Sequence, residues 1–229
     1  SVAHGADAVA YFRWRTCLFG AEQFWQGILN HSRHRDWRYD EVKRTGEELL
    51  RLSNDLVGSK VDSQVAVLYS HETAWAFGFQ PHLPDFNYRS HVQSFHKALY
   101  TLGIPCDIIY RQTELGSYRL ILAPSLWLVD DATMARLRKY VSDGGFLVAT
   151  MRTAVKDANN NVRDILPPAQ IAEIFGIAVT EYKPLKKPSG LEVSFAGEKD
   201  KDRAFAAEIC AEKIECKGAD TMATYRTSI

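Results

Sequence analysis

The chain has 229 residues, of which 46% are apolar and 24% charged, so it is long enough to bury one or two sizeable cores. Lys plus Arg and Asp plus Glu each number 28, which leaves a net charge of +0 at pH 7. A chain with no net positive charge has no general attraction for nucleic acid or anionic membranes, so we expect neither as a partner. No apolar run approaches the roughly 20 residues that span a bilayer.

The chain begins Ser-Val-Ala-His, without an initiator methionine, and a predicted strand follows closely, so we expect a piece of a longer protein. No glycine-rich phosphate loop or other cofactor motif occurs, and we expect no cofactor. The cysteines form no C-x-x-C pair and accompany no histidine cluster, which favours free thiols over zinc ligands and fits a cytoplasmic protein. They are Cys17, Cys106, Cys210 and Cys216.

The first predicted elements are a strand and a helix. Residues 8–13 alternate in the manner of a short strand that is buried on both faces of a parallel sheet. Gly20 ends the following loop, and residues 21–29 are predicted to be helical, with Phe24, Trp25 and Leu29 as the apolar members. Strand, loop and helix make half of a βαβ unit. In barrel enzymes, the end of such a strand and the loop after it form the active-site face.

A second helix is predicted after the polar loop 30–38. Asp40 can cap this helix, which runs to about Val57 and stops at Gly58, a residue type typical of helix ends. We place a domain boundary at 58–63, so that the chain divides into residues 1–58 and residues 62–229.

The second domain alternates strands and helices. Strands are predicted at 64–70, 104–110, 118–123, 146–150 and 177–182. Helices are predicted from Val92 to Gly103, from Asp130 or Asp131 through Val141, and from Pro168 to Gly176. This alternation predicts an α/β fold with a doubly wound parallel sheet and helices on both faces.

The segments between these elements are predicted to be irregular. Residues 71–87 are expected to form a long aromatic loop, and residues 152–166 a mobile polar one. After a loop at 183–190, residues 191–195 alternate like an exposed strand, and 197–203 form a charged turn. The pattern of 205–215 fits helix or strand, and we favour strand.

Two strings resemble glycoside hydrolase family 42, the β-galactosidases. AHGADAVAYFRWR at 3–15 and GAEQFWQG at 20–27 are similar to the eighth strand of that family's catalytic (β/α)8 barrel and the loop and helix after it. YRLILAP at 118–124, YVSDGGFLV at 140–148 and the ATY that ends at Tyr225 resemble its trimerisation domain. The resemblance implies a flavodoxin-like, glutamine-amidotransferase-like fold, and a chain that stops before that domain's closing strands.

The resemblance also implies substrate-binding residues. Glu22 matches a position that binds galactose hydroxyls, and Phe12 matches an aromatic position that lines the sugar subsite. Trp25 departs from the histidine that some members carry, and Trp14 is assigned to the same wall. Phe12 and Trp14 as plain core residues, and Glu22 on a solvated helix face, remain the alternative. Both catalytic glutamates would belong to earlier barrel strands, so we expect no catalytic residue here.

The intact protein is therefore expected to hydrolyse terminal β-D-galactosides with retention and to form a homotrimer. A stand-alone interaction module with an inactive amidotransferase-like fold is the alternative. A working amidotransferase is disfavoured, because Pro124-Ser125-Leu126 follows the third strand where a Gly-x-Cys-x-Gly elbow is needed. The string from His71 to Trp75 fails the H-E-x-x-H zinc motif, and His91 and His96 are poorly placed to share a metal.

Overall fold

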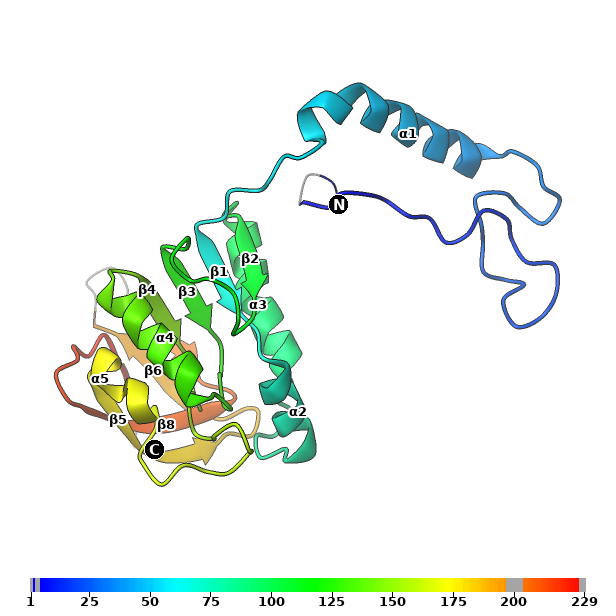
Figure 1. Ribbon diagram of the computed structural model, residues 1–229. Helices are drawn as coiled ribbons and strands as arrows, with labels where there is room; N and C mark the ends of the chain where they lie inside the picture. The colour runs from blue at the N-terminus through cyan, green and yellow to red at the C-terminus, as the bar shows by residue number, and fades with distance from the viewer. Residues whose placement is uncertain (1, 3–4, 197–203, 227–229) are drawn as a thin grey trace. The chain divides into compact units, whose positions relative to one another are not determined.

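The computed structural model describes residues 2, 5–196 and 204–226, and the predicted charged turn at 197–203 lies outside them. The chain divides into two compact units, unit 1 at residues 1–62 and unit 2 at residues 63–229 (Figure 1). Within the described residues, none of the helices is both long and apolar enough to cross a membrane.

Unit 1 holds the long helix α1 (Trp37–Leu56). Its cap is Asp36, whose side chain accepts a hydrogen bond from the Arg38 backbone N–H at 3.1 Å, so the prediction of Asp40 as the cap was wrong by one turn. The predicted end of the helix is confirmed, since Gly58 follows it with a φ of +78°.

The strand predicted at 8–13 and the helix predicted at 21–29 were both wrong. Residues 8–13 run without strand pairing, and residues 21–25 form turns. A single parallel bridge joins Arg15 to Leu29. A strand takes its backbone hydrogen bonds from neighbouring strands, and an alternating sequence pattern alone does not supply them.

Unit 2 is built on a four-stranded parallel sheet with the order β2-β1-β3-β4. Val65 is paired with Cys106 on one side and with Leu120 on the other, which gives the register of these three neighbouring strands. All four strands were predicted from the sequence. They are β1 (Val65–Leu68), β2 (Cys106–Ile109), β3 (Leu120–Ala123) and β4 (Phe146–Ala149).

Helices cover both faces of this sheet, as predicted (Figure 1). Ala66 and Leu68 pack with Met134 and Leu137 of α4 (Asp131–Ser142). The alternate residue Val67 packs on the opposite face, with Phe77 of α2 (His71–Phe79) and with Val92 and Leu99 of α3 (Tyr88–Thr101). Because successive strand residues point to opposite faces, one short strand joins two hydrophobic cores.

Helix α2 occupies half of the segment predicted to be a loop. Ser70 caps it, since its hydroxyl accepts from the Thr73 N–H at 2.9 Å. The apolar residues of this helix are spread around its axis instead of along one face, so no helical period shows in the sequence. The prediction of a loop holds only for residues 80–87.

The strand predicted at 177–182 lies outside the parallel sheet, which corrects the predicted five-stranded arrangement. This strand, β5 (Ile177–Pro184), pairs antiparallel with β8 (Cys210–Cys216). A further small sheet has the order β7-β6-β9, with β6 (Glu192–Phe195) between β7 (Ala204–Ala206) and β9 (Ala223–Tyr225). The preference for strand at 205–215 is therefore confirmed. The helix predicted from Pro168 is a 3-10 turn, η2 (Ala169–Ile171), followed by α5 (Ala172–Phe175).

Residues 152–156 are buried, which contradicts the mobile segment predicted there. The Arg152 guanidinium carbon lies 3.6 Å from the centre of the Tyr182 ring on β5. The Arg152 backbone N–H donates to the Glu212 carboxylate on β8 at 2.8 Å. These contacts join the loop after β4 to the β5–β8 pair.

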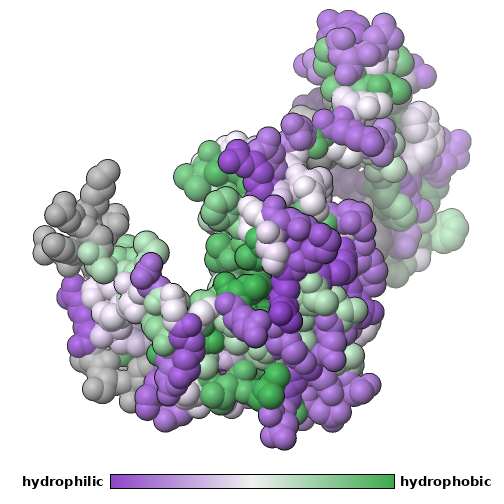
Figure 2. All heavy atoms as spheres, turned by 60° about the vertical axis from the view of Figure 1, so that its left-hand side comes forward, coloured by the Kyte–Doolittle hydropathy of each residue, from purple (hydrophilic) through white to green (hydrophobic). Residues whose placement is uncertain are grey.

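On the face shown in Figure 2, apolar side chains gather in separate patches between polar ones.

His82 lies beside this junction. Its ring stacks on Phe77 with centroids 5.5 Å apart and packs against Trp127 at 4.6 Å. Burial lowers the pKa of His82, and the positive charges of Arg152 and Lys156 lower it further. The folded protein therefore favours the neutral imidazole.

Because the pKa of His82 is lower in the folded than in the unfolded chain, its protonation favours unfolding. We expect the free energy of unfolding to fall as the pH drops from 7 to 5, through the unfolded value of about 6.5. His82→Gln should show a smaller fall over this range, measured by urea denaturation. His34→Gln, at an exposed loop position, is the matched control and should retain the full fall. Burial also lowers the pKa of His91, but His91 contributes equally to the pH dependence of the wild type and of both variants.

The turn into β4 depends on Gly145. The Tyr140 ring lies directly over its Cα, while the Tyr140 hydroxyl reaches the carbonyls of Tyr118 and Phe146 at 3.1 and 3.3 Å. A Cβ at position 145 would overlap that ring. We expect Gly145→Ala to lower the free energy of unfolding by about 1–3 kcal/mol in chemical denaturation. Gly116→Ala, where a Cβ meets nothing within 4 Å, is the control. Equal midpoints for the two variants would contradict this account.

Candidate functional site

In unit 1, two short segments of one loop lie side by side. The Ile28 N–H donates to the Arg13 carbonyl at 2.8 Å, and the Leu29 N–H to the Trp14 carbonyl at 2.8 Å. The buried Thr16 hydroxyl donates to the Leu29 carbonyl at 3.0 Å and accepts from the Gly27 N–H at 2.9 Å. A Cβ at Gly27 would lie 2.7 Å from the backbone carbon of Arg15, so only glycine permits this approach.

This pairing brings Phe12 and Trp25 together. Their ring centroids lie 6.2 Å apart at an interplanar angle of 67°, the edge-to-face geometry that aromatic pairs prefer. Phe12 is 71% exposed and Trp25 57% exposed, so neither is a core residue of this chain. The two exposed rings form an aromatic patch on the surface of unit 1.

Glu22 stands next to this pair. Arg13 Nη1 lies 2.6 Å from Glu22 Oε2, and the Arg13 guanidinium carbon lies 5.4 Å from the centre of the Phe12 ring. Arg13 therefore links the carboxylate to the aromatic surface. We call Phe12, Arg13, Glu22 and Trp25 the aromatic–carboxylate cluster. Three members of this cluster were predicted from the sequence. Arg13 was missed, although it stands between Phe12 and Trp14 in the sequence.

Trp14 is placed apart from the cluster. Its ring contact is with Tyr39 of α1, at 6.4 Å and 72°. Trp14 is 62% exposed in this chain. Glu22 lies on a turn rather than on a helix face.

A crevice of ≈ 320 Å³ opens in unit 2 at the carboxyl ends of β1 and β2, beside the loop that follows β3. Arg111, just after β2, bridges two helix starts, since its guanidinium lies 3.3 Å from Glu72 and 2.5 Å from Asp130. Asp130 also caps α4, accepting from the Thr133 N–H at 2.6 Å, and the bonds from Thr133 and Arg111 hold its pKa below the usual range despite burial. Sequence reasoning missed this crevice, because its charged residues are far apart along the chain.

The place of an amidotransferase nucleophile is taken by Ser125, with a φ of +42°. Ser125 is fully buried, and its hydroxyl lies 3.2 Å from that of Thr150, which in turn lies 3.2 Å from His91 Nε2. Cys106 lies within β2, and burial raises the pKa of its thiol. A sealed serine and an unactivated thiol do not make an accessible nucleophile. No group of three or more His, Cys, Asp or Glu side chains suited to a metal ion occurs among the described residues.

Two family models match the chain. The model for the β-galactosidase trimerisation domain matches residues 63–229, and the model for β-galactosidase matches residues 1–52. The two matches follow the two units of the structure.

Named relatives agree with these matches. β-Galactosidase BgaA from Clostridium cellulovorans is 36% identical over 185 residues, which are 81% of this chain and 28% of that protein. β-Galactosidase Bga from Halorubrum lacusprofundi is 35% identical over 214 residues, 93% of this chain and 30% of that protein. The chain thus spans less than a third of the length of these two relatives.

Solved structures share the fold. The β-galactosidase of Halorubrum lacusprofundi superposes with a TM-score of 0.89 at 32% identity, over 98% of this chain and 32% of that one. A catalytic mutant of Gan42B, a family-42 β-galactosidase from G. stearothermophilus, gives a TM-score of 0.92 at 27% identity, over 99% of this chain and 33% of that one. The chain therefore belongs to glycoside hydrolase family 42, the β-galactosidases, and carries the trimerisation domain of that family.

Proposed function

We propose that this chain is part of an enzyme that hydrolyses terminal β-D-galactosides with retention, and that the aromatic–carboxylate cluster forms one wall of its sugar subsite. The observation that carries this proposal is the Arg13–Glu22 pair beside the exposed rings of Phe12 and Trp25. The relatives support it, because proteins that match nearly the whole chain are named β-galactosidases.

Each member of the cluster has a role that fits a sugar. The Phe12 and Trp25 rings offer apolar surface to the C–H groups of a sugar ring. Glu22 can accept hydrogen bonds from vicinal hydroxyls, and Arg13 holds it in position. Trp25 has one N–H donor and no acceptor, so it contributes surface more than hydrogen bonding. We also keep Trp14, whose ring packs against Tyr39 and not against the cluster, as a proposed part of the subsite wall in the intact enzyme.

Retaining hydrolysis needs two carboxyl groups about 5–5.5 Å apart. In unit 1 the ionic partner of Glu22 is a guanidinium, not a second carboxyl group. We therefore propose that both catalytic glutamates lie on barrel strands outside this chain, and that residues 1–58 are the end of that barrel. The chain alone then binds or shapes a subsite without cleaving the substrate.

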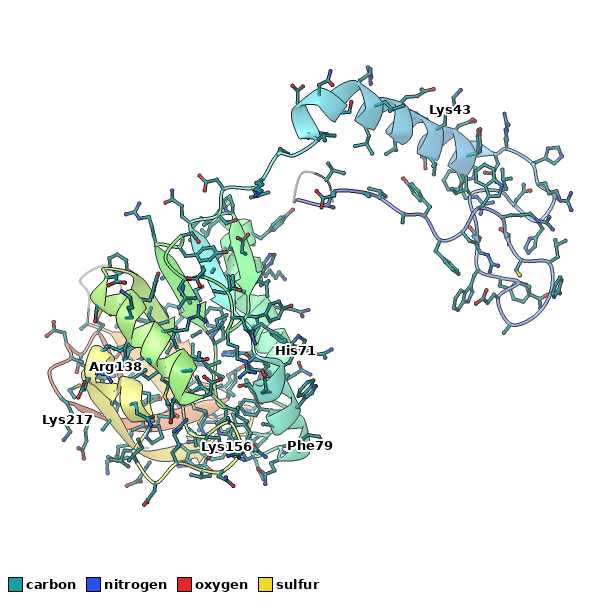
Figure 3. All side chains as sticks on the ribbon, in the orientation of Figure 1. Lys43, His71, Phe79, Arg138, Lys156 and Lys217 are labelled. Atoms are coloured by element: carbon teal, nitrogen blue, oxygen red, sulfur yellow. The ribbon has the colours of Figure 1, made fainter. Side chains whose placement is uncertain are left out.

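Unit 2 is the second part of the proposal, as the trimerisation domain of a homotrimer. The strand order β2-β1-β3-β4 fits the first four strands of a flavodoxin-like sheet. Trp75 is 58% exposed and Phe79 is 81% exposed, one turn apart on α2. Figure 3 marks His71 and Phe79 at the two ends of this helix. Large aromatic side chains left exposed on one helix face are typical of a subunit contact.

The subsite assignment is tested in the full-length enzyme. We expect Glu22→Gln to lower kcat/KM for a chromogenic β-galactoside by about 10- to 100-fold, because a hydrogen bond to a charged group contributes about 1.5–3 kcal/mol. Glu41→Gln, at an exposed position on α1, is the matched control and should keep full activity. Unchanged kcat/KM for Glu22→Gln would remove the cluster from the subsite.

The inactivity of the chain by itself is tested directly. We expect no turnover of the chromogenic β-galactoside above the blank, because a lone carboxylate cannot act both as nucleophile and as acid. Turnover that scales with the concentration of the chain would contradict the proposal.

The trimer is tested by light scattering of the chain in solution. We expect three times the chain mass of 25.9 kDa, and a loss of that species in Phe79→Ser. Leu102→Ser, at a residue 72% exposed beyond the end of α3, is the control for removing an exposed apolar side chain elsewhere. A trimer that both variants retain would show that α2 is not the contact, and a monomeric wild type would show that this chain does not trimerise by itself.

A further inference from the structure

The crevice of unit 2 occupies the position where α/β sheets bind ligands. Strand β1 lies between β2 and β3, and the connections that leave β1 and β3 run to opposite faces of the sheet, through α2 and α3 on one side and α4 on the other. Ligands of open α/β sheets bind outside the carboxyl ends of the strands at such a reversal. Its ≈ 320 Å³ lies at the lower end of the range of about 300–1,000 Å³ that small-molecule sites cover.

The charged groups of the crevice already satisfy one another. Asp130 Oδ1 accepts from the Thr133 N–H at 2.6 Å, and its Oδ2 accepts from Arg111 at 2.5 Å. Glu72 accepts from the Ser70 hydroxyl at 3.2 Å and pairs with Arg111 at 3.3 Å. One guanidinium shared between two carboxylates leaves no surplus positive charge for an anion. The three groups carry a formal net charge of −1, but both carboxylates already accept hydrogen bonds within the protein, and an organic cation is therefore the competing ligand to test.

Other polar groups of the crevice remain for a ligand. The Tyr69 and Tyr110 hydroxyls, the His71 ring and the Gln112 amide all border the crevice, and within the described part of the chain no hydrogen bond engages these side-chain groups. A hydroxyl both donates and accepts, as does an amide, so these groups suit ligands that carry hydroxyl groups.

The same residues supply an aromatic wall. The His71 and Tyr110 rings are stacked, with centroids 5.5 Å apart and an interplanar angle of 10°. Tyr69 meets both edge-on, at 4.9 and 6.2 Å. The floor is apolar, with Leu68, Leu126 and Leu128. Flat aromatic and apolar surface ringed by neutral donors and acceptors is the chemistry that recognises the C–H face and the hydroxyls of a sugar ring.

We propose that this crevice is a binding site for a neutral, hydroxyl-rich molecule of the size of one sugar ring, held by the stacked His71 and Tyr110 rings and by the Gln112 amide. The site is formed by unit 2 alone and is distinct from the aromatic–carboxylate cluster of unit 1. It stands whether or not the cluster binds galactose.

The test is saturation-transfer NMR on the 229-residue chain, with D-galactose, D-glucose and choline as observed ligands and with inorganic phosphate, which has no C–H protons, as a competitor. We expect saturable binding of at least one sugar, no binding of choline, and no loss of the sugar signal when phosphate is added. Tyr110→Phe removes only the hydroxyl, and Gln112→Ala removes the amide together with one methylene group. Each should weaken the affinity of the sugar about fivefold, the effect of one lost hydrogen bond. Gln93→Ala, an exposed glutamine on α3, is the matched control and should bind as wild type.

Glu22→Gln separates this site from the cluster of unit 1. Sugar binding that survives Glu22→Gln and weakens in Tyr110→Phe and Gln112→Ala supports the crevice. Binding lost in Glu22→Gln and kept in the two crevice variants overturns this proposal while supporting the cluster. Absence of saturable sugar binding, or binding of choline or phosphate in its place, also overturns it.

Discussion

Strand β1 is the element on which unit 2 depends. Its backbone is hydrogen-bonded to β2 on one edge and to β3 on the other, and Ala66, Val67 and Leu68 are at most 2% exposed. Its alternate side chains join the core under α4 to the core under α2 and α3. The chain that leaves its carboxyl end supplies Tyr69, Ser70 and His71 to the crevice. A cavity-forming change in β1 would therefore loosen both cores and the crevice together.

Unit 1 lacks a comparable centre. No residue of α1 is buried, and the aromatic side chains around Phe12 and Trp25 remain at the surface. Local hydrogen bonds through Thr16 and Gly27 hold the loop together, but they bury little apolar area. Apolar surface of this kind gains stability only when something else covers it. Such exposed apolar surface fits the proposal that residues 1–58 are the end of a barrel.

The sequence predicted those elements whose signals are local. The four strands of the parallel sheet, the caps at Asp130 and Gly58 and the period of Val92, Phe95 and Leu99 all lie within a few residues of the element they mark. Helix α2 was missed because its apolar residues are spread around the helix axis and show no helical period. The antiparallel place of β5 was missed because strand pairing is set by distant partners, in this case β8.

The site residues divide in the same way. Resemblance named Phe12, Glu22 and Trp25, and the structure brings all three into one cluster. It could not place Trp14 against Tyr39, because that contact spans 25 positions and depends on how the loop folds onto α1. The ion pairs from Arg111 to Glu72 and Asp130 join three separate stretches of sequence, so no short sequence pattern predicts them.

Helix α2 connects the two proposals for unit 2. Its first turn borders the crevice, where Glu72 pairs with Arg111, and its last turn carries the exposed Phe79. Thr73 fixes the helix from within, since its buried hydroxyl donates to the Leu128 carbonyl at 3.2 Å and accepts from the Leu128 N–H at 3.1 Å. The walls of the crevice are therefore already ordered, so binding a ligand costs little conformational entropy of the protein. Subunits that meet through the outer face of α2 would be coupled to a ligand in the crevice. Any free energy by which the ligand stabilises the position of α2 would also stabilise the subunit contact, and assembly would change the ligand affinity by the same free energy.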